Sequence, residues 1–171
     1  MSRTDSSFSA DLSHIFTRPT GIVGIGNTLR SDDAVGCYVA DQLEACLADG
    51  TPHQVLNAED VIENYVFRLA ESPVEHILVV DAVQGSGQPA GSLVLGRLTE
   101  LETGDGVFLG QSTHKLALSM ASSILEQHGK QVYLLGIAAE NIDFGMQMSP
   151  DIQDSAEMVI ALLAGHAGRS H

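Results

Sequence analysis

The stretch HILVVDAV, residues 76–83, decides the fold class of this chain. It is an almost continuous apolar run, rich in β-branched residues, and such a run is typical of a strand that is buried on both faces. Strands of this kind occur in parallel sheets that carry helices on both sides. The run therefore predicts an α/β protein in which residues 76–83 form a strong strand of the sheet.

Strands and helices are predicted to alternate on either side of this run. Further strands are expected at 21–26, 53–59, 92–98 and 131–139. Helices are expected where apolar residues recur at helical spacing, at 32–48, 61–71, 114–128 and 150–164. The strand at 92–98 follows a short loop, so it is expected to lie antiparallel to its predecessor. The alternation predicts a three-layer α/β/α sandwich with a mostly parallel, twisted sheet of about five strands, one of them antiparallel.

The length and the net charge of the chain limit the number of domains and the kinds of partner that we expect. The 171 residues include 8 Lys and Arg against 22 Asp and Glu, a net charge of −14, which disfavours nucleic acid and anionic membranes as partners. No apolar run approaches the ~18 residues of a membrane span. Cys37 and Cys46 lie on one predicted helix and are not expected to pair. We expect a flexible polar tail over 1–17, a single α/β domain over 18–171, and a cytoplasmic monomer.

Three polar residues fall at the edge of the predicted sheet where α/β proteins bind ligands, the carboxyl end of the strands. Asp33 lies in the first turn after strand 21–26, Asp81 ends the run HILVVD, and His114 starts the third helix. Two carboxylates and an imidazole can bind a divalent transition metal and leave positions open for a substrate. The helix N-termini are expected to keep Asp33 ionised and His114 neutral, the form that binds a metal.

Each of these residues also has a purely structural interpretation. Ser31, Asp32 or Asp33 could cap the helix that follows. The aspartate at the end of the strand, Asp81, could cap a loop, and a histidine at a helix start, such as His114, could be a surface residue. Taken singly, none of the three decides between a structural and a chemical role.

The loop GIGN, residues 24–27, could also cradle a phosphate group, as dinucleotide-binding loops do. That fingerprint requires G-x-G-x-x-G, but Leu29 stands where the third glycine belongs. Asp32 and Asp33 would then repel a pyrophosphate. A serine nucleophile is disfavoured because no GxSxG motif is present.

Four motifs occur in an order and spacing similar to those of one protein family. They are GIGNTLRSDDAVG (24–36), VVDAV (79–83), STHKLAL (112–118) and LLGIAAENIDFGMQMSP (134–150). Together they resemble the nickel–iron hydrogenase maturation endopeptidases, over about residues 21–163. Members of that family remove a C-terminal extension from the hydrogenase large-subunit precursor after nickel has been inserted.

The resemblance implies roles for the three polar residues. Asp33, Asp81 and His114 would recognise the nickel that the precursor already carries, and Asp33 and Asp81 would serve as catalytic carboxylates of an aspartic-type or nickel-directed endopeptidase. The nickel arrives with the substrate, so no tightly bound metal of the protein's own is expected. The partner implied is the hydrogenase large-subunit precursor.

The resemblance also assigns the glycine loop to the substrate side of the site. Gly24, Gly26 and Asn27 would let the backbone pass close by and hold this loop. Three other functions stay open at this point: a non-catalytic chaperone that recognises the nickel site, a nucleotide-binding α/β protein, and an independent zinc hydrolase.

Overall fold

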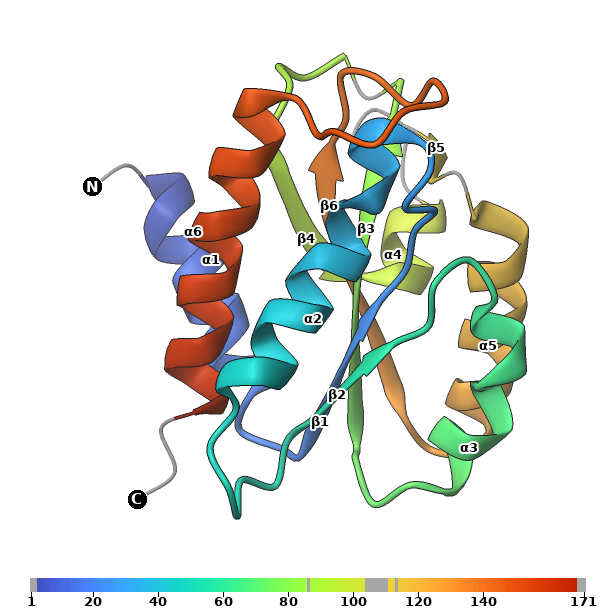
Figure 1. Cartoon of the computed structure of the whole chain (residues 1–171). Coiled ribbons are helices and arrows are strands. Elements are labelled where there is room, and N and C mark those ends of the chain that lie inside the picture. The colour runs from blue at the N-terminus through green and yellow to red at the C-terminus, as the bar shows by residue number, and fades with distance from the viewer. Residues whose placement is uncertain (1–2, 86, 104–110, 113, 169–171) are drawn as a thin grey trace.

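The computed structural model describes residues 3–85, 87–103, 111–112 and 114–168 (Figure 1). Its sheet has the order β2-β1-β3-β6-β4, with a short β5 paired to β3. The strands are β1 (Thr20–Gly24), β2 (Gln54–Asn57), β3 (His76–Gln84), β4 (Leu93–Arg97), β5 (Gln111–Ser112) and β6 (Gln131–Ala138). β3 is the middle strand of this order and runs parallel to both β1 and β6, as its apolar run predicts.

The strand predicted at 92–98 is antiparallel, but its partner differs from the expected one. β4 pairs with β6, from Leu93 opposite Ile137 to Arg97 opposite Tyr133, and not with β3. The expectation of pairing with β3 is wrong because β1 and β6 already occupy both edges of β3. β4 therefore lies at the outer edge of the sheet, and β6 occupies the position between it and β3.

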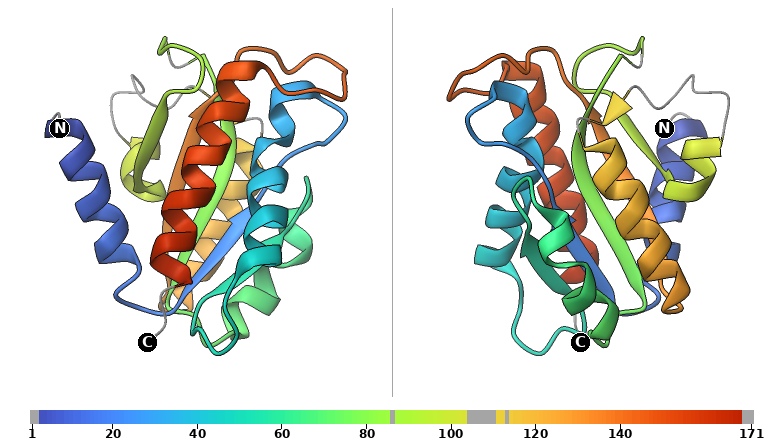
Figure 2. Two further views of the ribbon diagram at one scale, coloured as in Figure 1. Left: turned by 60° about the vertical axis from the view of Figure 1, so that its left-hand side comes forward. Right: turned by 90° about the vertical axis from the view of Figure 1, so that its right-hand side faces the viewer.

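Helices cover both faces of the sheet and make the predicted three layers (Figures 1 and 2). One face carries α1 (Arg3–Ile15), α2 (Val35–Cys46) and α6 (Pro150–Ala167); the other carries α3 (Val66–Glu71), α4 (Leu98–Thr103) and α5 (Lys115–Gln127). Two short 3-10 helices, η1 (Ser31–Ala34) and η2 (Ile62–Asn64), precede α2 and α3.

Alternate residues of β3 pack into the two halves of the core. Leu78 and Val80 contact the cluster under α1, α2 and α6, while Ile77 and Val79 belong to the cluster under α3, α4 and α5. This alternation follows from the period of two along a strand. Asp81 lies in the same row as Ile77 and Val79, so its side chain belongs to the face that α5 covers.

The N-terminal segment is a helix and not the flexible tail that its polar composition predicts. In α1, Leu12 and Ile15 are buried, and Phe8 packs against the same cluster. Spacings of four and three residues put these side chains on one face of a helix. The C-terminal end of α1 is held by Thr20, whose Oγ donates a hydrogen bond of 3.0 Å to the carbonyl oxygen of Ile15. The tail prediction is therefore wrong for residues 3–15.

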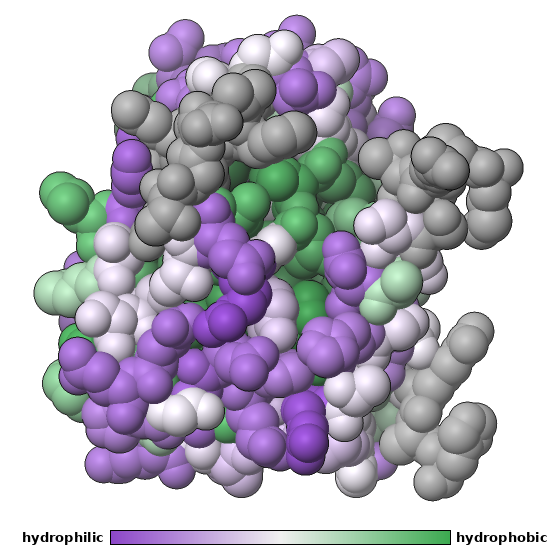
Figure 3. Space-filling model, turned by 180° about the vertical axis from the view of Figure 1, so that it is seen from behind, coloured by the Kyte–Doolittle hydropathy of each residue, from purple (hydrophilic) through white to green (hydrophobic). Residues whose placement is uncertain are grey.

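The surface is largely polar, as the net charge of −14 leads one to expect. Seen from behind, hydrophilic side chains cover most of the lower half, and apolar side chains gather in one area above them (Figure 3). Within the part of the chain that the structure describes, no helix combines the length and apolar character that crossing a membrane requires.

Candidate functional site

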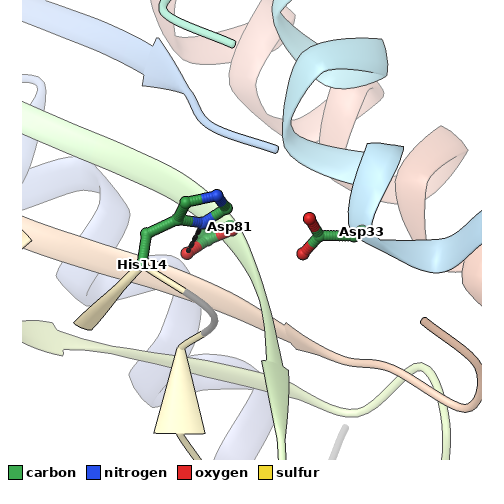
Figure 4. Close-up of side chains that lie close together, drawn as sticks. All are labelled: Asp33, Asp81 and His114. Atoms are coloured by element: carbon green, nitrogen blue, oxygen red, sulfur yellow. Dashed lines mark hydrogen bonds and ion pairs between the residues drawn. The ribbon is translucent and has the colours of Figure 1, made fainter. Parts of the chain in front are cut away.

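The structure brings together the three polar residues that the sequence singles out (Figure 4). Asp33 lies in η1, Asp81 near the carboxyl end of β3, and His114 directly before α5. One ligand atom from each lies within 4.8 Å of the others. The predicted meeting point at the carboxyl edge of the sheet is thereby confirmed for Asp33, Asp81 and His114.

Both carboxylates are buried, and both accept hydrogen bonds. Asp81 Oδ1 accepts one of 2.9 Å from the backbone N–H of Ala82, and its Oδ2 lies 3.4 Å from Nδ1 of His114. Asp33 Oδ2 accepts a hydrogen bond of 3.1 Å from the backbone N–H of Asn27. The side chain of His114 is 12% exposed. Two buried carboxylates side by side favour a cation between them, because burial leaves their charges poorly solvated.

The pKa of His114 is shifted by burial and by its acidic neighbours in opposite directions. Burial of the imidazole lowers its pKa, but the hydrogen bond to Asp81 and the charge of that carboxylate raise it. The charges of Asp33 and Asp60 act in the same direction, and the net pKa lies above the ordinary value. The hydrogen bond and the acidic side chains together therefore outweigh the effect of burial on the pKa of His114. That His114 is neutral stays a prediction.

The donor set fits a divalent transition metal. Imidazole nitrogen is a common ligand of nickel and zinc, and a carboxylate supplies charge as well as an oxygen. Tetrahedral donors about 2.0–2.2 Å from one ion lie about 3.3–3.6 Å from one another. The most widely separated donor atoms, which lie within 4.8 Å of each other, would therefore have to approach by at most about 1.5 Å. Three donors leave coordination positions open for groups that a substrate brings.

Asp32 has a structural task that its position in the sequence does not reveal. It is fully buried and caps neither η1 nor α2, in contrast to the predicted capping role. Its Oδ2 accepts hydrogen bonds from the backbone N–H groups of Glu140 (3.0 Å) and Asn141 (2.8 Å) and from Oγ of Ser149 (2.9 Å). Its Oδ1 accepts one from the N–H of Ser149 at 2.6 Å. Asp32 thus fixes both ends of the loop 140–149.

The glycines of the loop allow a close approach between the loop and α2. A Cβ on Gly24 would lie 2.1 Å from the carbonyl oxygen of Gly36, and one on Gly26 would lie 2.0 Å from that of Asp33. Both distances are impossible for a real side chain, so only glycine fits. The predicted tight loop is present, and these contacts set the position of Asp33. A contact of Gly24, Gly26 or Asn27 with substrate stays a prediction.

The backbone N–H groups of the same loop are largely used within the protein, which leaves few of them to hold a phosphate. The N–H of Gly26 donates to the carbonyl oxygen of Glu59 (2.8 Å), and that of Asn27 donates to Asp33. The N–H of Leu29 donates to Oδ1 of Asn27 (2.9 Å). A phosphate cradle needs such N–H groups to be available. The geometry of the described loop therefore disfavours the nucleotide-binding alternative.

Comparison with known proteins identifies a family that this chain resembles over most of its length. The model of the hydrogenase maturation protease family matches residues 37–166. The hydrogenase 3 maturation protease of Escherichia coli K12 is 25% identical over 145 residues, which are 84% of this chain and 88% of that protein.

Solved structures show the same arrangement of strands and helices. A nickel–iron hydrogenase maturation protease from Thermococcus kodakarensis KOD1 superposes with a TM-score of 0.75 and 28% identity, over 92% of this chain and 98% of that one. A hydrogenase maturating endopeptidase from E. coli shares the fold, with a TM-score of 0.70 and 21% identity over 86% and 90% of the two chains. From the family match, which spans most of its length, this chain belongs to the hydrogenase maturation protease family.

Proposed function

We propose that this protein is the endopeptidase that removes the C-terminal extension of a nickel–iron hydrogenase large-subunit precursor after nickel insertion. The observation that carries the proposal is the convergence of Asp33, Asp81 and His114 from three separate segments at the carboxyl edge of the sheet. The family match supports the protease activity, and the donor set supports recognition of a metal.

Nickel is part of the substrate in this proposal. The precursor presents its bound nickel, and the two carboxylates and the imidazole complete the coordination of the ion. A precursor without nickel would leave the carboxylates of Asp33 and Asp81 facing each other with no cation between them, so it should bind weakly. The enzyme would then act only after metal insertion, and would carry no tightly bound metal of its own.

The hydrolysis requires a general base that activates the attacking water and a Lewis acid that polarises the scissile carbonyl group. We assign the base to the carboxylate of Asp33 or Asp81, which takes a proton from the attacking water while the oxygen of that water adds to the scissile carbonyl carbon. The nickel of the substrate polarises the carbonyl group. The proton then passes to the leaving amine as the C–N bond breaks.

The experiment that tests this function compares nickel-loaded and nickel-free precursor. The purified protein is incubated with each, and intact masses are measured. We expect loss of a C-terminal peptide from the loaded form alone, and a large loss of rate for Asp33→Asn. Asp41→Asn is the matched control, because Asp41 is an exposed carboxylate on α2 that bonds to Asn57. Cleavage by Asp33→Asn at the normal rate would rule out the assigned role.

Other outcomes would point to the remaining alternatives. Binding of the loaded precursor without cleavage would identify a non-catalytic chaperone. Stoichiometric zinc in the purified protein, with hydrolysis of small peptides, would identify an independent zinc hydrolase. Thermal protection by a nucleotide but not by nickel would identify a nucleotide-binding protein.

The same proposal places the enzyme in the cytoplasm as a monomer. Cys37 and Cys46 are both free thiols, which suits a reducing compartment. Cell fractionation tests the location, and the mass in solution tests the oligomeric state.

A further inference from the structure

Exposed apolar side chains gather around the candidate site. Among the described residues, seven large hydrophobic side chains are exposed, and five belong to loops at the carboxyl edge of the sheet or to the first two turns of α5: Leu29, Leu116, Met120, Phe144 and Met146. Single exposed hydrophobic residues are ordinary, but a group of them at one place marks a binding surface. Phe144 is 84% exposed and Met146 78%, so neither contributes much to the core.

Three of these residues lie on two loops beside η1 that are hydrogen-bonded to each other. The loop 140–149 lies next to the loop that follows β1 at the top of the molecule (Figures 1 and 2). Gly145 joins the two: its N–H donates to the carbonyl oxygen of Leu29 (2.8 Å), and its own carbonyl accepts from the N–H of Ser31 (2.9 Å). Phe144 and Met146 flank this glycine. We call Leu29, Phe144 and Met146 the docking ledge.

The docking ledge is rigidly connected to the candidate site. Asp32 fixes both ends of the loop 140–149, and the next residue, Asp33, is one of the three donors. Ser31 adopts a left-handed φ of 53°, unusual for a residue with a side chain, and its Oγ donates to the carbonyl oxygen of Asp143 (2.8 Å). Backbone conformations of this kind are retained where the surrounding structure holds them. The backbone that carries the apolar side chains is therefore held in place relative to the donors.

The charges around the ledge define the chemistry of its partner. Glu140 and Asp143 are exposed on the same loop, and the whole chain carries a net charge of −14. The guanidinium of Arg30 is turned to this loop, where Nε donates to the carbonyl oxygen of Ile142 (3.2 Å). The surface is thus apolar with an acidic rim, which complements an apolar segment with basic residues beside it.

We infer that the docking ledge binds an extended polypeptide segment of the metal-carrying precursor, with apolar side chains on the ledge and basic residues against Glu140 and Asp143. This inference rests on the proposed function, because the occupant is the protein that brings the metal to Asp33. The ledge supplies affinity and register for the chain, while the three donors recognise the ion. A segment seated on the ledge places the neighbouring peptide bonds beside the donors.

The test measures binding of the nickel-loaded precursor to full-length variants. The double variant Phe144→Ser, Met146→Ser removes the ledge, and Phe67→Ser is the matched control. Phe67 is 63% exposed but lies on α3, at the opposite end of the molecule (Figure 1). We expect the Kd to rise at least tenfold for the double variant and to stay within twofold for the control. The same loss should appear as a fall in kcat/KM for cleavage of the loaded precursor.

The outcomes separate this inference from the proposed function. If the wild-type protein cleaves the precursor and the double variant binds it with a Kd within twofold of the wild-type value, the docking inference is refuted and the protease function is supported. If the wild-type protein binds the precursor without cleaving it and the double variant binds tenfold more weakly, the docking inference is supported and the protease function is refuted. Failure of the wild-type protein to bind the precursor refutes both. Melting temperatures of all variants, and the milder Met146→Gln, show that an effect on Kd is not a folding defect.

Discussion

A single buried carboxylate should account for the order of the loop 140–149, and Asp32→Asn tests this. The replacement has the same shape but one oxygen fewer. In the native protein Oδ2 accepts three hydrogen bonds and Oδ1 accepts one of 2.6 Å from the N–H of Ser149. Whichever way the asparagine is turned, its NH2 group faces at least one donor. One charge-assisted bond is lost, and one buried N–H is left without an acceptor.

The expected cost follows from these two losses. A hydrogen bond to a charged group contributes ~1.5–3 kcal/mol, and an unsatisfied buried donor costs ~1–3 kcal/mol. The two costs overlap, so we expect the free energy of unfolding to fall by about 2–4 kcal/mol. For a chain of this length 1 kcal/mol corresponds to ~2–4 °C, so the melting temperature should fall by roughly 5–15 °C.

Urea unfolding followed by circular dichroism measures the global effect, and limited proteolysis within 140–149 measures the local one. Asp41→Asn, at an exposed carboxylate, should change the free energy of unfolding by less than about 0.5 kcal/mol. Faster proteolysis with unchanged global stability would mean that Asp32 holds only the loop. An unfolding free energy within 0.5 kcal/mol of the wild-type value together with unchanged proteolysis would refute the reasoning.

Three further predictions follow from buried groups near the site and at the far edge of the sheet. Gly26→Ala places a methyl group 2.0 Å from the carbonyl oxygen of Asp33, so the free energy of unfolding in urea should fall by about 1–3 kcal/mol or more. Nickel-dependent cleavage should fall as well, and normal activity would contradict this prediction. Burial, with nearby carboxylates, raises the pKa of Cys37 to about 12, so iodoacetamide at pH 8 should modify the exposed Cys46 and leave Cys37 intact in a mass spectrum of peptides. Burial lowers the pKa of His53, so its contribution to stability is complete above its unfolded pKa of about 6.5 and is lost as the pH falls through the folded value. Unfolding at pH 7.5 and 5.5 should therefore show an acid loss that is smaller in His53→Asn, and equal losses would contradict this.

The sequence by itself determined the features that depend on neighbouring residues. The run at 76–83 could be assigned to a strand buried on both faces because it lacks a polar face, and β3 is that strand. The three donors could be selected because Asp81 ends an apolar run, Asp33 lies in the first turn after a strand and His114 begins a helix, and parallel strands bring such positions to one edge of the sheet. The start of the last helix at Pro150 was predictable for a similar local reason.

Only the tertiary structure decided features that depend on distant partners. Asp32 and Asp33 are adjacent and chemically identical, yet Asp32 holds a loop more than a hundred residues away, while Asp33 turns toward Asp81 and His114. β4 could have paired with β3 by its spacing, but the edges of β3 were already occupied. A local pattern reports which face of an element is apolar. The partner of each carboxylate and the pairing of each strand edge depend on the complete fold, because every segment needs buried hydrogen-bond partners at once.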